Sequence, residues 1–162
     1  MAQKSITLIL DNLRSCHNVG SILRTADGFG VKHVVMVGTT PYPELQDDTR
    51  LPHQRRKQTA QIAKTALGAE QKPIYSYVSD YEELLQLIGN LPIYSLEQTN
   101  SSVELGMDIK HPEFALVVGN EVSGVSPILI DASISTLEIP MAGQKESFNV
   151  SVATGIALYA LL

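Results

Sequence analysis

Three short stretches combine glycines with polar side chains at spacings that could carry chemistry. "HNVGSILRTADGFGV" contains Arg24, "VVGNEVSGVS" contains Glu121, and "IPMAGQKESFN" contains Ser147 and Asn149. Guanidinium, carboxylate, hydroxyl and amide groups of this kind can bind a polar ligand and orient it. The second stretch is neither a GxGxxG fingerprint nor a P-loop, so it does not indicate a nucleotide-phosphate site of either type.

Each stretch also has an ordinary structural interpretation. Gly20 lies one helical turn before Arg24 and leaves room beside the guanidinium, but a surface arginine paired with Asp27 fits the same pattern. Gly119 and Gly124 let the backbone approach a ligand, yet they also suit a purely structural turn. The third stretch favours a site more clearly, because two successive predicted strands then end in Gly-rich polar turns, where α/β proteins bind ligands.

These residues need elements to position them, and the sequence predicts alternating strands and helices. The predicted strands are 5–10, 33–37, 74–78, 93–96, 114–118 and 136–139. Several are apolar at consecutive positions, as expected for strands covered on both faces. Helical patterns lie between them, with predicted N-caps at Asn18, Ser126 and Ser147. The alternation predicts an α/β domain with a mainly parallel sheet flanked by helices.

One connection is too long for this pattern. Residues 39–58 contain three prolines and no convincing period, and six of the twelve Lys and Arg residues lie between Arg50 and Lys72. The net charge is −5, but residues 1–72 carry +4 and residues 73–162 carry −9. This distribution would let a polyanion bind one side of the molecule, but charge alone favours a solvated basic loop.

Composition excludes several classes of protein. The 162 residues are 44% hydrophobic and 18% charged, which suits one folded domain over residues 1–162. A single cysteine excludes a disulfide framework, and the four scattered histidines lack metal-ligand spacing. The apolar C-terminal run is predicted to be a buried helix, because it is too short to span a membrane. With no secretory leader, a soluble cytoplasmic protein that binds neither metal nor membrane is expected.

Taken in order, the three stretches resemble the motifs of the SpoU/TrmH family of RNA 2′-O-ribose methyltransferases, within the SPOUT superfamily. The matching residues are Asn18, Gly20, Arg24 and Ala26 in the first motif, Gly119, Glu121, Gly124 and Ser126 in the second, and Ile139, Pro140, Met141, Gly143, Ser147, Asn149, Val150 and Ser151 in the third. Phe148 stands where the family usually has leucine. The resemblance covers essentially the whole chain.

The resemblance implies a C-terminal deep trefoil knot, S-adenosyl-L-methionine as the cofactor, and a homodimer packed through the C-terminal helix region. The implied cofactor-binding residues are Leu96, Gly119, Asn120, Glu121, Ile139, Met141, Gly143, Ser147, Phe148 and Asn149. The implied catalytic residues are Arg24, Glu121, Ser147 and Asn149. Arg24 either activates the ribose hydroxyl or clamps a phosphate and orients the ribose.

The implied substrate is tRNA or rRNA, bound by a minimal form of the family without an added RNA-binding domain. The residues expected to bind RNA are Asn18, Arg24, Arg50, Arg55, Arg56, Lys57 and Lys64. Two alternatives remain open: a SPOUT enzyme that methylates an RNA base, and a catalytically silent RNA-binding module. The ribose hypothesis is favoured because Arg24 and the third motif match the ribose-modifying branch, and because a binding module does not need all four catalytic residues.

Overall fold

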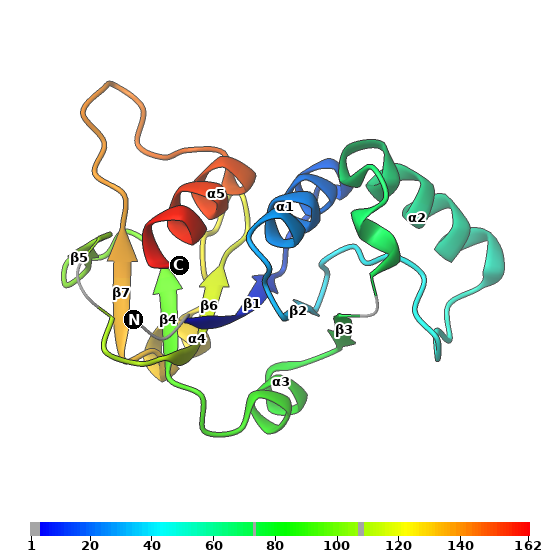
Figure 1. The fold of residues 1–162 in the computed structure, drawn as a ribbon, viewed down its shortest axis with the longest axis horizontal. Helices are drawn as coiled ribbons and strands as arrows, with labels where there is room; N and C mark the ends of the chain where they lie inside the picture. The colour runs from blue at the N-terminus through cyan, green and yellow to red at the C-terminus, as the bar shows by residue number, and fades with distance from the viewer. Residues whose placement is uncertain (1–3, 73, 107–108) are drawn as a thin grey trace.

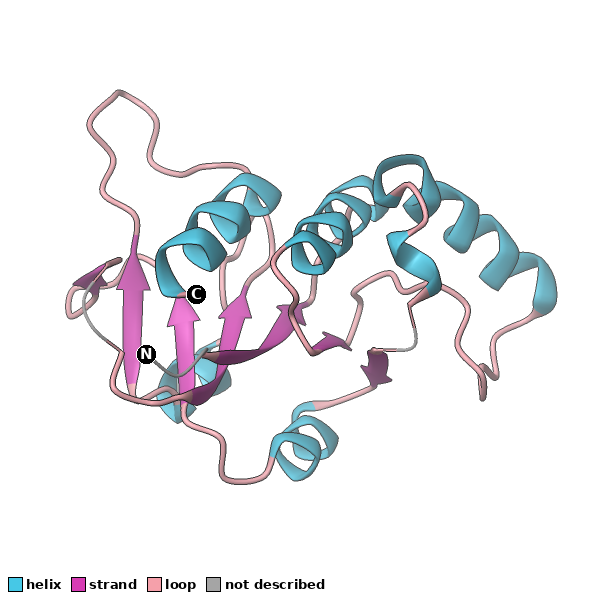
Figure 2. Cartoon of the chain, viewed as in Figure 1, coloured by secondary structure: helices cyan, strands magenta, loops and turns pink. Residues whose placement is uncertain are grey.

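A seven-stranded parallel sheet forms the centre of the computed structural model, which describes residues 4–72, 74–106 and 109–162 (Figures 1 and 2). The strands are β1 (Ser5–Asp11), β2 (His33–Val37), β3 (Tyr75–Val78), β4 (Ile93–Leu96), β5 (Val103–Glu104), β6 (Glu113–Val118) and β7 (Ser135–Glu138). The helices are α1 (Cys16–Gly28), α2 (Pro52–Ala66), α3 (Tyr81–Ile88), α4 (Pro127–Ala132) and α5 (Val150–Leu161), with a short 3-10 helix, η1 (Ala69–Gln71).

The strand order is β3-β2-β1-β6-β4-β7-β5, and every pairing between strands is parallel. The chain builds outward from β1 through β2 to β3 and then continues on the other side of β1, where β6 lies between β1 and β4. The direction of winding therefore reverses between β1 and β6. The carboxyl ends of these two strands flank the switch point of the sheet, where ligands of α/β proteins usually bind.

Helices cover both faces of the sheet, which explains the consecutive apolar positions of its strands. Leu8 and Leu10 of β1 belong to the apolar core shared with α1, α2 and α5, whereas Ile9 belongs to the core shared with α3 and α4. Figure 1 shows these two groups of helices on opposite sides of the sheet. The six predicted strands are confirmed to within one residue at each end. The two-residue strand β5 was not predicted, because it is too short to leave a pattern.

Two of the predicted N-caps are wrong. Ser15 caps α1, and its Oγ accepts a hydrogen bond from Asn18 N at 3.2 Å, so that Asn18 lies inside the first turn. Asn149 rather than Ser147 caps α5, and its Oδ1 accepts from Ser151 N at 2.9 Å. In the described part of the chain, no helix is both long and apolar enough to cross a membrane.

Helix α2 was not predicted as a helix and begins inside the connection at residues 39–58. Pro52 occupies its first turn, where a missing N–H is harmless. The helix lies on the surface, and only Ile62 and Ala66 are buried. So small an apolar stripe leaves no period for sequence analysis to detect.

At Gly20, α1 lies in close contact with α2. A Cβ atom on Gly20 would overlap the carbonyl oxygen of Ile62 and Oγ1 of Thr65. The prediction that Gly20 leaves room beside Arg24 is therefore wrong, since the missing side chain makes space for the backbone of α2. This close contact fixes the basic helix α2 against α1.

Candidate functional site

The loops that follow β4, β6 and β7 enclose an open cleft at the carboxyl edge of the sheet, with a volume of about 620 Å³. Its lining comprises residues 96–98, 119–125, 137–139, 141, 146–150 and 153. The loop between β7 and α5, orange in Figure 1, extends beyond the rest of this edge. Every residue predicted to bind the cofactor lines the cleft except Gly143, which lies in that loop but outside the lining.

The turn after β6 depends on Gly119 and Gly124. A Cβ atom on Gly119 would overlap the backbone of Val125, and Gly124 has a φ of +72°, which disfavours other residues. Asn120 N donates to Gly124 O and Gly124 N donates to Asn120 O, both at 2.9 Å. The side-chain oxygen of Asn120 accepts two further N–H groups of the turn. The Asn120 side chain therefore shapes the turn.

Glu121 binds the beginning of α1. Its Oε2 accepts from Arg14 N at 3.0 Å, and its Oε1 accepts from Ser15 N at 3.2 Å and from Asn18 Nδ2 at 2.9 Å. Burial acts to raise the pKa of Glu121, but the hydrogen bonds from Asn18 and from backbone N–H groups outweigh it and lower the pKa. The carboxylate thus connects the segments that follow β6 and β1, at the switch point of the sheet, and it positions Asn18.

Asn18 connects the first motif with the third. While its Nδ2 donates to Glu121, its Oδ1 accepts from Asn149 Nδ2 at 3.2 Å. Asn149 Oδ1 in turn accepts from Ser151 N at 2.9 Å and from Ser151 Oγ at 2.6 Å. A continuous chain of hydrogen bonds therefore joins the starts of α1 and α5. The Asn18 amide, expected to contact RNA, is engaged at both ends within the protein.

Arg24 lies apart from this group. It is exposed on α1, six residues beyond Asn18, which corresponds to about 9 Å along a helix. It lines a second cleft of about 550 Å³ between α1 and α2, together with Ser21, Thr25, Lys64, Thr65 and Leu67. Asp27 pairs with Lys72 at 3.3 Å and not with Arg24. Within the described residues, the Arg24 side chain has no hydrogen-bond or ion-pair partner.

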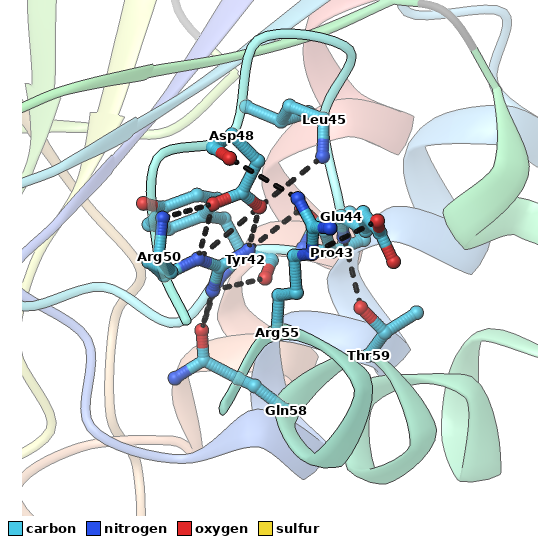
Figure 3. A network of polar contacts seen from close by, with 9 residues as sticks. All are labelled: Tyr42, Pro43, Glu44, Leu45, Asp48, Arg50, Arg55, Gln58 and Thr59. Atoms are coloured by element: carbon cyan, nitrogen blue, oxygen red, sulfur yellow. Dashed lines mark hydrogen bonds and ion pairs between the residues drawn. The ribbon is translucent and has the colours of Figure 1, made fainter. Parts of the chain in front are cut away.

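Arg50 joins the loop before α2 to the helix itself (Figure 3). Its Nε donates to Asp48 Oδ1 at 2.9 Å and its Nη1 to Tyr42 O at 3.1 Å. Nη1 also donates to Gln58 Oε1 on α2, and Nη2 donates to Pro43 O and Asp48. Every nitrogen of the guanidinium has a partner in the protein. Arg50 therefore has a structural role, and the RNA contact expected for it stays a prediction.

The same network orders the aromatic rings beside Arg50. The guanidinium carbon lies 3.6 Å from the centroid of the Tyr42 ring, and Tyr42 stacks on Tyr77 with ring centroids 4.0 Å apart. The hydrogen bonds from Arg50 lower the pKa of Asp48 to about 2, although burial acts in the opposite direction. The loop is thus held by charge, stacking and hydrogen bonds together.

The remaining basic residues of α2 differ in their availability. Arg55 Nη1 donates to Asp48 O at 3.2 Å and its Nε lies 3.1 Å from Glu44 Oε1, so Arg55 is largely engaged by the loop. The other three predicted RNA contacts on this helix are exposed, and none of them pairs with another described residue. These three are Arg56, Lys57 and Lys64.

Glu97 is a site residue that sequence analysis missed. It directly follows β4 and lines the cleft, where its Oε2 accepts from Val125 N at 2.8 Å. A Cβ atom on Gly124 would overlap this oxygen, so Glu97 and Gly124 fit together at the turn after β6. In the sequence, the one signal for Glu97 was a carboxylate directly after a predicted strand. Only the pairing of β4 with β6 shows that this carboxylate meets the Gly-rich turn.

The two clefts carry opposite charges. The lining of the first contains four carboxylates and no basic side chain, whereas the second contains two cations and no carboxylate. The carboxylates belong to Glu97, Glu121, Glu138 and Glu146. An acidic cleft attracts a cationic ligand and repels phosphate, and a basic one does the reverse. Among the described residues, no group of His, Cys, Asp and Glu side chains could hold a metal ion.

Comparison with known proteins agrees with this geometry. Residues 5–159 match the model of the SpoU rRNA Methylase family. The chain is 31% identical over 156 residues to the 23S rRNA (guanosine-2′-O-)-methyltransferase RlmB of Burkholderia sp, covering 95% of this chain and 57% of that protein. The TrmH/SpoU tRNA modifying enzyme of A. aeolicus is 28% identical, with a TM-score of 0.75 over 98% of this chain and 74% of that one.

A third likeness concerns the fold alone. The AdoMet-bound rRNA methyltransferase of Sinorhizobium meliloti is 23% identical, with a TM-score of 0.79 over 98% of this chain and 56% of that one. The present chain spans little more than half the length of the curated relatives it matches. The family match nevertheless runs from β1 to α5 and includes all three motifs. The resemblance seen in the sequence is thereby confirmed, and the chain belongs to the SpoU rRNA methylase family.

Proposed function

We propose that this chain transfers a methyl group from S-adenosyl-L-methionine to a ribose 2′-hydroxyl of tRNA or rRNA, as a single methyltransferase domain over residues 1–162. The observation that carries the proposal is the grouping of the second and third motifs around one acidic cleft, with the first motif bound to both through Asn18. The names of two relatives support it, since one is a guanosine-2′-O-methyltransferase of 23S rRNA and the other a tRNA modifying enzyme.

The acidic cleft fits the proposed cofactor in size and in charge. Its volume of about 620 Å³ lies within the range of small-molecule sites, which is roughly 300–1,000 Å³. Its carboxylates suit a ligand that carries a sulfonium and an ammonium group, and Ile139 and Phe148 offer an apolar wall for an adenine ring. When bound, S-adenosylmethionine supplies a methyl group on a positively charged sulfur that is ready for displacement. The solved structure from S. meliloti is described as AdoMet bound.

The residues of the chain have to shape the cleft and orient the ribose. Glu97 and Glu121 hold the turn after β6, and Asn149 holds the start of α5, so these three residues fix the walls of the cleft. A ribose hydroxyl is a weak nucleophile until its proton is removed or its oxygen is polarised. Because a guanidinium stays protonated in proteins, we assign Arg24 to donating hydrogen bonds that orient the ribose or its phosphate.

We also propose the family's C-terminal trefoil knot and a homodimer packed through α5. The apolar residues exposed along and beside this helix support the dimer. Val152 and Tyr159 are 50% and 79% exposed, and Phe148 precedes the helix on the same segment. For RNA, we retain Arg24, Arg56, Lys57 and Lys64 as contacts, because these side chains have no partner among the described residues.

Replacing Arg24 tests the proposed function. We expect Arg24→Ala to slow methyl transfer to RNA more than about tenfold, a barrier increase above roughly 1.4 kcal/mol, because the variant loses the donors that we assign to orienting the ribose or its phosphate. Affinity for S-adenosylmethionine should stay unchanged, because Arg24 does not line the acidic cleft. Radiolabelled transfer to unmodified RNA and calorimetry measure these two quantities, and mass-spectrometric mapping of ribose methylation identifies the nucleotide. Activity within tenfold of the wild type would overturn the role of Arg24.

A further inference from the structure

The cleft between α1 and α2 is separate from the cofactor cleft and carries positive charge. We propose that it binds a phosphodiester group of the RNA substrate, with Lys64 as the main phosphate contact and Arg24 beside it. This proposal rests on the proposed function, since it takes RNA as the substrate, and it adds where the RNA backbone is held.

Two cations from different helices reach the same cleft. Arg24 extends from α1 and Lys64 from α2, and both are exposed without a partner among the described residues. Thr25 Oγ1 donates to Ser21 O at 3.0 Å, and Thr65 Oγ1 donates to a backbone carbonyl of α1 at 2.8 Å. The hydrogen-bond donors left in the cleft are therefore the guanidinium, the ammonium and the Ser21 hydroxyl. This set of donors suits a phosphate, which accepts hydrogen bonds and carries negative charge.

The contact between α1 and α2 fixes the backbone that carries these donors. Because Gly20 has no side chain, α2 lies close enough for Thr65 Oγ1 to reach the carbonyl oxygen of His17. Arg24 lies one turn after Gly20, and Lys64 immediately precedes Thr65. The two cations therefore extend from fixed helical backbone instead of a mobile loop. No segment of main chain has to be ordered when the cleft binds its ligand.

The opposite charges of the two clefts favour the same assignment. The four carboxylates of the cofactor cleft repel RNA phosphates, although the reacting ribose has to reach that cleft. A phosphate bound between α1 and α2 places the RNA backbone against residues 1–72, which carry a net charge of +4. The chain thus separates a cationic cofactor from an anionic substrate by placing them in clefts of opposite sign.

Two substitutions test the site without touching the cofactor cleft. Lys64→Gln removes one cation, and Ser21→Glu adds a carboxylate beside both cations while leaving them in place. Binding of unfractionated tRNA is measured between 50 and 200 mM salt, a range over which each phosphate contact accounts for roughly a threefold loss of affinity. Over this range of salt, we expect the tRNA affinity of Lys64→Gln to fall by a factor about threefold smaller than that of the wild type. Ser21→Glu should bind tRNA more weakly than Lys64→Gln does. Lys64→Arg should behave like the wild type.

Three controls separate the possible outcomes. Lys32→Gln removes an exposed lysine from the amino edge of β2 and should leave tRNA affinity unchanged, and thermal unfolding should show that all variants are folded. An unchanged salt dependence in Lys64→Gln, or an equal loss of affinity in Lys32→Gln, overturns the proposal. Calorimetry should show no micromolar binding of inorganic phosphate to the wild type. Micromolar phosphate binding that Lys64→Gln abolishes, combined with an unchanged tRNA affinity in that variant, would assign the cleft to a free anion and overturn the RNA assignment.

The outcomes also distinguish this proposal from the proposed function. Calorimetry with S-adenosylmethionine should give the wild-type affinity for Lys64→Gln and Ser21→Glu, because neither residue lines the acidic cleft. A wild-type chain that transfers no methyl group, combined with a flattened salt dependence in Lys64→Gln, refutes the proposed function and supports the phosphate site. A wild-type chain that methylates RNA, combined with an unaffected Lys64→Gln, refutes the phosphate site alone.

Discussion

At the scale of single residues, two carboxylates of the acidic cleft accept hydrogen bonds from the backbone around it. Glu121 accepts from two backbone N–H groups at the start of α1, and Glu97 accepts from Val125 N in the turn after β6. Val125 is only 6% exposed, and Glu97 is the acceptor for its N–H, so the loss of that carboxylate leaves the N–H without its protein partner. An unpaired buried N–H costs about 1–3 kcal/mol. The shape of the cleft therefore depends on these two glutamates.

Glu97 gives the sharpest test at this scale. We expect Glu97→Ala to weaken binding of S-adenosylmethionine by about tenfold or more. The lost hydrogen bond from Val125 N costs roughly 1–3 kcal/mol, and this cost destabilises the turn that lines the cleft. Glu97→Gln keeps an oxygen that can accept from Val125 N and should recover most of the affinity. Calorimetry measures both. Glu113→Ala, at the exposed start of β6, is the control and should keep the wild-type affinity. A wild-type affinity in Glu97→Ala would refute the role of Glu97 in shaping the cleft.

At the scale of elements, α2 and the loop before it form one unit. Arg50 links the Tyr42 and Pro43 carbonyls and Asp48 to Gln58 on the helix, and Thr59 Oγ1 accepts from Glu44 N at 2.8 Å (Figure 3). Together with the glycine contact to α1, this network determines where the exposed basic residues of α2 lie. In the proposed RNA complex, the loop acts through the position of the helix.

This unit should be sensitive to acid. The pKa of Asp48 is lowered from its ordinary 3.8 to about 2, so ionised Asp48 stabilises the folded state above about pH 4 and this contribution is lost as the pH falls toward 2. At pH 6 we expect Asp48→Asn to lower the free energy of unfolding by about 1–2 kcal/mol, a value reduced for a loop at the surface. Urea unfolding at several pH values should show this difference shrinking below pH 4. Asp47→Asn is the control and should leave the free energy of unfolding unchanged.

Strands and motifs could be predicted from this sequence more readily than caps, surface helices and contacts. Apolar runs identify the six longer strands, because burial on both faces leaves few polar positions within them. Helix α2 escaped detection because it buries little more than Ile62 and Ala66. Glu97 and Arg50 acquire their roles from partners that only the strand order and the folded loop bring near. Their local sequence therefore carried no signal of those roles.

At the scale of the whole molecule, charge and exposed apolar surface are separated. The two clefts carry opposite charges, and the large apolar side chains most exposed on α5 belong to the lining of neither cleft. Val152 and Tyr159 are seven residues apart, so they lie on the same side of the helix. A second copy of the chain that covers this side would remove them from water.

The proposed dimer can be tested on this side of α5. Because central interface residues each contribute about 2 kcal/mol or more, Val152→Glu combined with Tyr159→Glu should raise the dimer dissociation constant by at least about a hundredfold. Analytical ultracentrifugation measures the change. Ile128→Glu, at a 46% exposed position on α4 across the sheet, is the matched control and should remain dimeric. A wild-type chain that sediments as a monomer would contradict the proposed dimer.

The pairing of β1 with β6 also affects how the chain is made. Ser5 pairs with Glu113 and Leu10 with Val118, so the first strand receives its second neighbour only after most of the polypeptide has left the ribosome. Until then, β1 to β3 can assemble, but one edge of β1 keeps its backbone groups unpaired. Pairings between such distant residues slow folding, and an open strand edge favours aggregation of nascent chains. The arrangement that places β6 beside β1, and the acidic cleft behind β6, therefore makes the folding of residues 5–37 depend on residues 113–118.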